Sequence, residues 1–266
     1  MSAIKYFFNN LLFLFFVLML TLNAQNKYNI SQFSDESIKF IKQPLTWEKK
    51  DWIKLGAVSV GTILTMYIDQ PVRDEYLINR NYYKSFPIEF GRKWGEIYTT
   101  VIIGGAFGLY GLIEDDNSTK RIGYEIFQTA FYSGIITQFL KISLGRARPF
   151  TNNGSNFYKP FTLFNDDFHS MPSGHATLAF ALSTILSENT DSKFLKIAAY
   201  IPAVLTAVSR VYQDNHWTSD VLLGAAVGYF VGNWVHKIHD SKVMNNESIE
   251  FYNTQNFQWI SIKIIF

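Results

Sequence analysis

Three short clusters in this sequence hold residue types that could bind and transfer a phosphoryl group. They read Lys141-x6-Arg148-Pro149, Pro172-Ser173-Gly174-His175 and Ser209-Arg210-x5-His216-x3-Asp220. Phosphoryl transfer depends mainly on positioning and on neutralising the charge of the equatorial oxygens, which guanidinium and ammonium groups can do. Each cluster adjoins an apolar stretch, and the start of a helix adds free N–H groups that favour an anion. The residue types therefore point to phosphate chemistry.

The third cluster contains a histidine that could act as a nucleophile. His216 and Asp220 are four residues apart, so they share one face if a helix begins near Trp217. A carboxylate that accepts the Nδ1 proton of an imidazole fixes its tautomer and leaves Nε2 free to attack. We therefore expect Asp220 to orient His216, although such a pair on its own is more often structural.

The second cluster has the composition of a helix start that could bind an anion. Gly174 allows close backbone approach, and His175 could donate a proton to a leaving oxygen. On its own, the second cluster could be an ordinary helix cap with a structural histidine. On their own, Lys141 and Arg148 could be solvated side chains that interact with the dipole at the end of a helix. Ionisable groups in apolar sequence are costly unless they serve a site, so the three clusters together favour one.

These clusters resemble the three signature motifs of the type 2 phosphatidic acid phosphatase superfamily. That superfamily includes lipid phosphate phosphatases, class A acid phosphatases, glucose-6-phosphatase and vanadium haloperoxidases. Every motif position is present in the right order, within about residues 97–236. The resemblance implies that His216 forms a phosphohistidine, that Asp220 orients it, and that His175 is the general acid and then the base. It also implies phosphate binding by Lys141, Arg148, Ser173, Gly174 and Arg210.

Composition limits the other kinds of site. The chain has no cysteine, which excludes disulfides, thiolate nucleophiles and Cys-ligated metals. It also lacks a carboxylate cluster spaced to hold Mg²⁺, so we expect neither a metal nor another cofactor. The formal net charge is +2 with dispersed Lys and Arg residues, and we expect no nucleic-acid partner.

Six apolar segments predict an all-α fold with a bundle of about six core helices. None shows the strict alternation of strands. The segments are residues 52–68, 97–113, 124–143, 174–187, 194–209 and 218–236. No linker or repeat divides the chain, so we expect a polar segment over 25–51, one phosphatase bundle over 52–240 and a tail over 241–266. Alternating isoleucines near the C-terminus predict a short strand in that tail.

The N-terminus predicts export. Lys5 precedes an apolar run over residues 11–22, followed by Ala24. This pattern is typical of a signal peptide over residues 1–24, or of an uncleaved anchor, because Leu22 is bulky for a cleavage site.

Composition favours a membrane-associated bundle. The longest uncharged run after the signal, residues 97–113, has 17 residues, slightly short of a usual span, so a soluble exported bundle is the alternative. Small residues such as Gly104, Gly108 and Gly228, and an aromatic content of 17%, suit helices packed in lipid. We expect an inner-membrane protein with an outward-facing site if residues 52–68 do not span, or a periplasmic one.

The expected function is metal-independent hydrolysis of a phosphomonoester or pyrophosphate through a phosphohistidine. Apolar flanking helices favour a phosphorylated lipid over a small phosphate ester as the partner. The alternatives are a soluble periplasmic acid phosphatase, a vanadium haloperoxidase or a non-catalytic relative, and the motifs do not identify the headgroup. The remaining candidates are expected to be structural or solvated: His169 in a loop, His236 and His239 as caps of the last helix, and Asp115, Asp116, Asp166 and Asp167.

Overall fold

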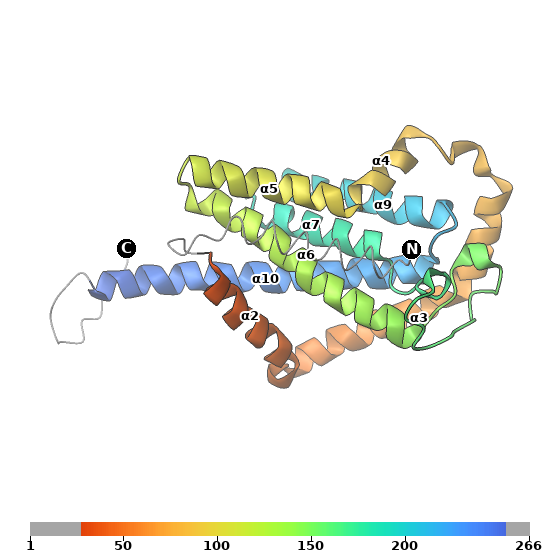
Figure 1. Ribbon diagram of the computed structural model, residues 1–266, viewed down its shortest axis with the longest axis horizontal. Coiled ribbons are helices and arrows are strands. Elements are labelled where there is room, and N and C mark those ends of the chain that lie inside the picture. Colours follow the sequence, from red (N-terminus) through yellow and green to blue (C-terminus); the bar gives the residue numbers. More distant parts are fainter. Residues whose placement is uncertain (1–27, 254–266) are drawn as a thin grey trace.

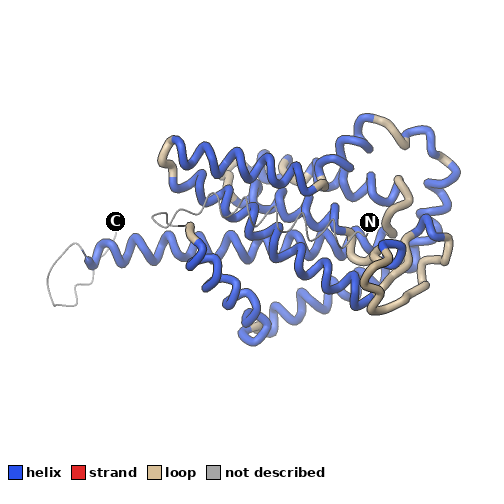
Figure 2. The backbone as a smooth tube through the Cα atoms, in the orientation of Figure 1, coloured by secondary structure: helices blue, strands red, loops and turns tan. Residues whose placement is uncertain are grey.

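The computed structural model describes residues 28–253, with side chains through residue 240, and this part of the chain is mainly helical, with a long loop over residues 145–173 (Figure 2). No β-strand occurs among these residues, which confirms the all-α prediction. The α-helices are α2 (Ile30–Lys42), α3 (Lys49–Ile78), α4 (Phe86–Trp94), α5 (Ile97–Ile113), α6 (Asn117–Leu144), α7 (Gly174–Glu188), α8 (Lys193–Ala198), α9 (Ile201–Tyr212) and α10 (Thr218–Asn253). Short 3-10 helices lie at Gln43–Thr46, Arg80–Tyr82, Pro149–Thr151 and Asp166–Phe168.

Helix α7 is at the centre of the bundle, between α6, α9 and α10 (Figure 1). Ala176, Ala179 and Ala181 are fully or almost fully buried, because small side chains let neighbouring helices approach closely. Helices α5 and α6 form an antiparallel pair beside α7, and α4 packs on α9. As a result, the C-terminal ends of α6 and α9 and the N-terminal ends of α7 and α10 meet at one end of the bundle.

Glycines on α10 set its distance from α7. A Cβ atom on Gly228 would lie 2.2 Å from the Thr177 carbonyl oxygen and 2.7 Å from the Ala181 nitrogen. Both neighbours are backbone atoms of a helix, so they cannot move aside without separating the two helices. Gly224 is equally confined, since its Cβ would lie 2.5 Å from the Ser173 carbonyl oxygen, next to the second motif.

Gly228→Ala is expected to lower the thermal unfolding midpoint of the purified protein. Overpacking of this kind costs about 1–3 kcal/mol. Gly105→Ala is the matched control, because nothing lies within 4 Å of a Cβ at that position of α5. It should leave the midpoint unchanged or raise it, since alanine favours the helix by up to about 1 kcal/mol. Equal midpoints for the two variants would contradict the assigned α7–α10 contact.

All six predicted segments are helical, with some changes in their bounds. The prediction for α5 matches its ends, whereas α3, α6 and α10 are longer than predicted. The segment 194–209 divides into α8 and α9, because Pro202 lies in the first turn of a new helix. Helices α2 and α4 were not predicted, and α2 falls within the segment expected to be only polar. The predicted signal peptide and terminal strand lie outside the described residues.

One expectation about the last helix was wrong. His236 and His239 do not cap it, because α10 continues to Asn253. The buried His239 lies between two buried carboxylates, with Nδ1 3.2 Å from Glu125 and Nε2 3.2 Å from Glu36. Both histidines therefore belong to a polar network that joins α2, α6 and α10.

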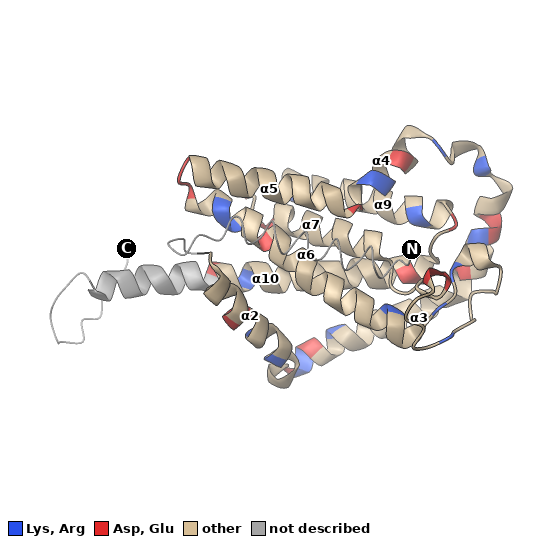
Figure 3. Ribbon diagram, viewed as in Figure 1, with Lys and Arg blue, Asp and Glu red and all other residues tan. Residues whose placement is uncertain are grey.

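Apolar side chains cover much of the outside of the bundle. By length and composition, one described stretch could cross a membrane, Lys193–Tyr212, and the pair α4 and α5 could form a second that bends by 65°. Large exposed apolar side chains also lie along α3, including Val60, Ile63 and Leu64. In Figure 3 most charged residues lie toward the ends of the helices, and α5 has none.

Candidate active site

A tight turn between α9 and α10 presents His216. The backbone nitrogens of Asn215 and His216 both donate to the Arg210 carbonyl, which closes the turn at the end of α9. Asp214 in this turn has φ of 58°, in the left-handed region that Asp tolerates better than most residues. Arg73 of α3 holds the Asp214 carboxylate through Nε at 2.7 Å and Nη2 at 3.1 Å. Helix α3 thereby fixes the turn that carries the histidine.

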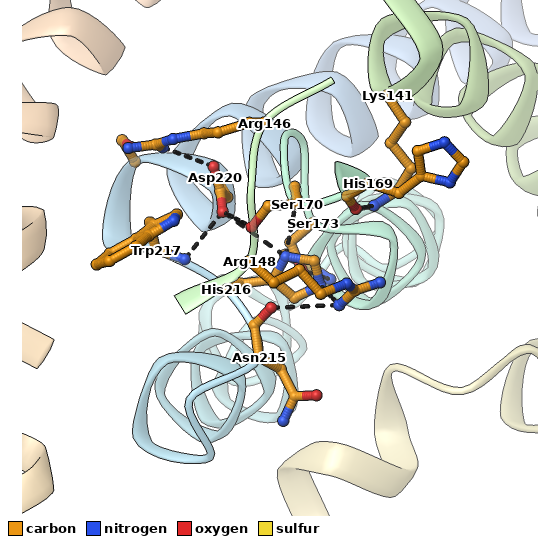
Figure 4. Close-up of polar contacts among 12 residues, drawn as sticks. Lys141, Arg146, Arg148, His169, Ser170, Ser173, Asn215, His216, Trp217 and Asp220 are labelled. Atoms are coloured by element: carbon orange, nitrogen blue, oxygen red, sulfur yellow. Dashed lines mark hydrogen bonds and ion pairs between the residues drawn. The ribbon is translucent and has the colours of Figure 1, made fainter. Parts of the chain in front are cut away.

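The His216 ring is buried and its tautomer follows from its hydrogen bond. Nδ1 lies 2.8 Å from the Ser170 carbonyl oxygen, which can only accept, so Nδ1 carries the proton. Nε2 then holds the lone pair, and it lies 3.3 Å from Nη1 of Arg148 (Figure 4). An imidazole in this state can attack an electrophile next to a guanidinium group.

The contact expected between Asp220 and His216 takes a different form. Asp220 Oδ2 is 3.8 Å from His216 Nδ1, beyond hydrogen-bond distance. That oxygen instead accepts from the Ser170 hydroxyl at 2.5 Å and the Trp217 nitrogen at 2.9 Å (Figure 4). Asp220 therefore holds the segments on both sides of the ring, and the Ser170 carbonyl is the direct partner of Nδ1.

Three cations from the first and third motifs lie at this end of the bundle, and Arg148 contacts the histidine. Arg148 donates to the carbonyl of Asn215 at 3.2 Å and to the Asp166 carboxylate at 2.9 Å. Lys141 is buried and donates to the His169 carbonyl, while the buried Arg210 donates to the Gln213 side chain at 3.2 Å. Asp166 was expected to be solvated, but it is half exposed and pairs with Arg148.

The second motif completes this end of the bundle. His175 is in the first turn of α7, with Nε2 3.4 Å from Glu96 Oε1. The Ser173 hydroxyl accepts from the Ala176 nitrogen as the N-cap of α7, and the Ser173 nitrogen donates to the Asp220 carbonyl at 2.9 Å. A Cβ on Gly174 would have no neighbour closer than 4.0 Å, so nothing packs tightly against this residue. The structure thus brings all the predicted site residues to one end of the bundle.

Burial and positive charge keep His216 neutral. Burial lowers its pKa well below the usual value, and the nearby Arg148, Lys141 and Arg210 lower it further. The same cations attract an anion, because water screens charges only weakly in a buried site. A phosphate group bound here would meet a neutral imidazole nucleophile and several fixed positive charges.

The lowered pKa of His216 predicts acid sensitivity of the fold. Above the usual imidazole pKa of about 6.5, the folded and unfolded states both carry a neutral ring. Below it, only the unfolded ring gains a proton, so the free energy of unfolding falls by up to about 1.4 kcal/mol per pH unit until the folded pKa is reached. His216→Gln should therefore lose less thermal stability than the wild type between pH 7.5 and 5. Parallel losses would contradict a neutral buried ring.

Several residues at this site were not predicted from the sequence. Arg146, Asp69 and Ser170 are fully or almost fully buried beside Asp220, and Glu96 lies beside His175. A weak signal existed for Arg146, a second arginine within the first motif. His169 has the structural role expected of it, since its Nε2 lies 2.6 Å from the Thr162 carbonyl oxygen. Among the side chains described, no group of three or more His, Asp or Glu residues is arranged to hold a metal.

The sequence of this chain is similar to those of known phosphatases. Residues 125–244 match the family model described as PAP2 superfamily, a range that contains all three motifs. A lipid A 1-phosphatase of Rhizobium johnstonii is 29% identical over 70% of this chain and 78% of its own length. A lipid A 1-phosphatase of Porphyromonas gingivalis is 38% identical over 38% of this chain, but the match spans only 20% of that protein.

A solved structure has the same fold. It is a transmembrane PAP2 type phosphatidylglycerolphosphate phosphatase from Bacillus subtilis, with a TM-score of 0.53 and 18% sequence identity. The match covers 71% of this chain and 96% of that one. The helical bundle predicted from the six apolar segments is therefore a known arrangement.

Proposed function

This chain contains a PAP2 superfamily domain, and on that premise we propose that it hydrolyses a phosphomonoester or pyrophosphate of a lipid through a phosphohistidine on His216. The single observation that supports this most is the pair of contacts made by the two ring nitrogens of His216. Nδ1 donates to the Ser170 carbonyl, and Nε2 faces the Arg148 guanidinium. The names of the two lipid A 1-phosphatases give independent support for a phosphatase.

In the first step the Nε2 lone pair attacks phosphorus and the bond to the leaving oxygen breaks. The electron pair of that bond stays on the leaving oxygen, which takes a proton from His175. Burial lowers the pKa of His175 to about 4 in the free protein, so in this proposal the ring takes up its proton when the anionic substrate binds beside it. Lys141, Arg148 and Arg210 neutralise the charge that builds on the phosphoryl oxygens. The Ser170 carbonyl stabilises the positive ring of the phosphohistidine through the Nδ1 proton.

In the second step water attacks the phosphohistidine. His175, now neutral, accepts a proton from the water, and the N–P bond breaks with its electron pair returning to Nε2. Inorganic phosphate leaves and both histidines regain their starting states. Every proton and electron pair is accounted for by the side chains and water, so the proposed reaction requires no metal.

The surface of the bundle supports a lipid substrate and a membrane location. Large apolar side chains are exposed along α3, α5, α8 and α9, which is costly in water but favourable in lipid. The stretch Lys193–Tyr212 is long and apolar enough to span, and it ends beside the site. A phosphorylated headgroup at the bundle end could then reach His216 while its chains stay in the bilayer. We keep the outward-facing orientation as part of this proposal.

The test is phosphate release from a panel of substrates in the presence of EDTA. The panel contains lipid A, phosphatidate, phosphatidylglycerol phosphate and a polyprenyl diphosphate beside short soluble esters. We expect release from at least one lipid, with a higher kcat/KM than for any soluble ester. A preference for soluble esters would favour the non-specific acid phosphatase instead, and absence of release from every substrate would contradict a phosphatase.

A further inference from the structure

Asp69 of α3 is buried against the start of α10, although it lies outside the residues that match the family model. Its Oδ1 accepts from the Ser219 backbone nitrogen at 2.9 Å. Its Oδ2 accepts from the Ser219 hydroxyl at 2.5 Å and from Arg146 Nη2 at 2.7 Å. This carboxylate therefore joins three donors from two segments of the site.

Arg146 connects Asp69 to the catalytic end of α10. Its Nη1 donates to Asp220 Oδ1 at 2.7 Å and to the Ser219 hydroxyl at 2.7 Å. Nε and Nη2 also donate to the Ser155 carbonyl, and the guanidinium is fully buried. Figure 4 shows Arg146 on the opposite side of Asp220 from His216. The guanidinium thus bridges two buried carboxylates.

The network reaches His216 through Asp220. Asp220 Oδ2 accepts from the Ser170 hydroxyl, and the Ser170 carbonyl accepts the Nδ1 proton of His216. Asp220 also holds the Trp217 nitrogen, directly after the histidine. Rotation of the Asp220 carboxylate would therefore displace Ser170 and the Trp217 backbone nitrogen, and with them the His216 ring.

The buried charge of Arg146 makes its contact with Asp220 dependent on Asp69. A buried guanidinium is costly unless its N–H groups are paired, and Asp69 supplies one of the two carboxylates on Arg146. An asparagine at position 69 would have one acceptor oxygen and one NH2 group. The NH2 group would face either the Ser219 N–H or the Arg146 N–H, so one donor would lose its acceptor.

We propose that Asp69 is a positioning residue, which acts through Arg146 to hold Asp220 and the start of α10 and thereby orients His216. It touches no reacting atom. The inference rests on the proposed function and gives Asp69 a role in positioning the catalytic histidine. It also explains why the Asp69 carboxylate is buried.

The experiment compares Asp69→Asn with the wild type and with Asp74→Asn, using the full chain and the best substrate of the panel. Asp74 is the control because it is also on α3 and pairs only with Gln70 in an exposed contact. Loss of an orienting partner costs about 10–100-fold, and we expect this in kcat for Asp69→Asn. KM and the inhibition constant of orthovanadate should change less, because Lys141, Arg148 and Arg210 are intact. Asp74→Asn should match the wild type.

Active-site titration separates this role from a loss of folding. A wild-type kcat per titrated site in Asp69→Asn, or a raised KM with unchanged kcat, would overturn the inference. If Asp69→Asn does not fold, the Ser219→Ala variant tests the inference instead. It removes one hydrogen-bond donor to Asp69 and keeps the charges of Asp69, Arg146 and Asp220. We expect a several-fold lower kcat with unchanged KM, and a wild-type kcat would overturn the inference. A wild type that releases no phosphate would instead contradict the proposed function.

Discussion

His216→Ala is expected to abolish phosphate release, with a loss of kcat on the order of 10⁴-fold or more, because the nucleophile is removed. Substrate binding should weaken far less, since Lys141, Arg148 and Arg210 remain in place. The measurement is single-turnover phosphate release, with orthovanadate inhibition or substrate binding as the control for an intact site.

A suitable control is His169→Ala, because His169 is a buried histidine near the site that has no role in the proposed mechanism. It contacts the Thr162 carbonyl and does not face the substrate in the proposed mechanism. It should retain much more activity per folded molecule than His216→Ala. Comparable activity of His216→Ala and the wild type would remove His216 from the mechanism.

Arg148→Ala is expected to lower kcat/KM by about 10²–10³-fold, because a fixed charge next to the developing phosphoryl charge is lost. Arg148 is the cation closest to the nucleophile, with Nη1 3.3 Å from His216 Nε2. Its other bonds, to the Asn215 carbonyl and to Asp166, hold the guanidinium in place. Arg148→Lys should restore only part of the activity, since an ammonium cannot donate as a planar fork.

The control for Arg148 is Arg80→Ala, which removes a half-exposed arginine that lies 3.7 Å from Asp214. Arg73 still holds Asp214 in this variant, so kcat/KM should change by only a few-fold. An Arg148→Ala enzyme as active as Arg80→Ala would contradict the placement of the phosphoryl group between Arg148 and His216.

The helices that could be predicted are those with a strong apolar signal. The run of residues 97–113 has no charged residue, and the structure begins and ends α5 at those positions. Helix α2 was not predicted because it has polar and charged residues among its apolar ones, although Phe33 and Glu36 are buried. Its stability comes from tertiary contacts with α6 and α10, such as Glu36 with Gln128 at 2.7 Å. Local sequence does not specify such contacts.

The sequence predicted most of the residues of the site, but not the hydrogen bonds that hold them in place. The motif spacing identifies the cations and histidines that the structure brings together. It does not reveal that a backbone carbonyl, that of Ser170, is the partner of His216 Nδ1. Nor does it connect Asp69 with Arg146, because these residues are 77 positions apart in the sequence and only the packing of α3 brings them together.

The most direct test of the account is to trap the phosphorylated enzyme. With His175→Asn and an ester whose leaving group needs no proton, such as 4-nitrophenyl phosphate, the first step can proceed while water attack lacks its base. We predict an acid-labile, alkali-stable phosphoryl group on His216, identified by mass spectrometry of the quenched protein and absent from His216→Ala. Rapid turnover with no phosphorylated His216 at any quench time, or a phosphoryl group on another residue, would contradict the account.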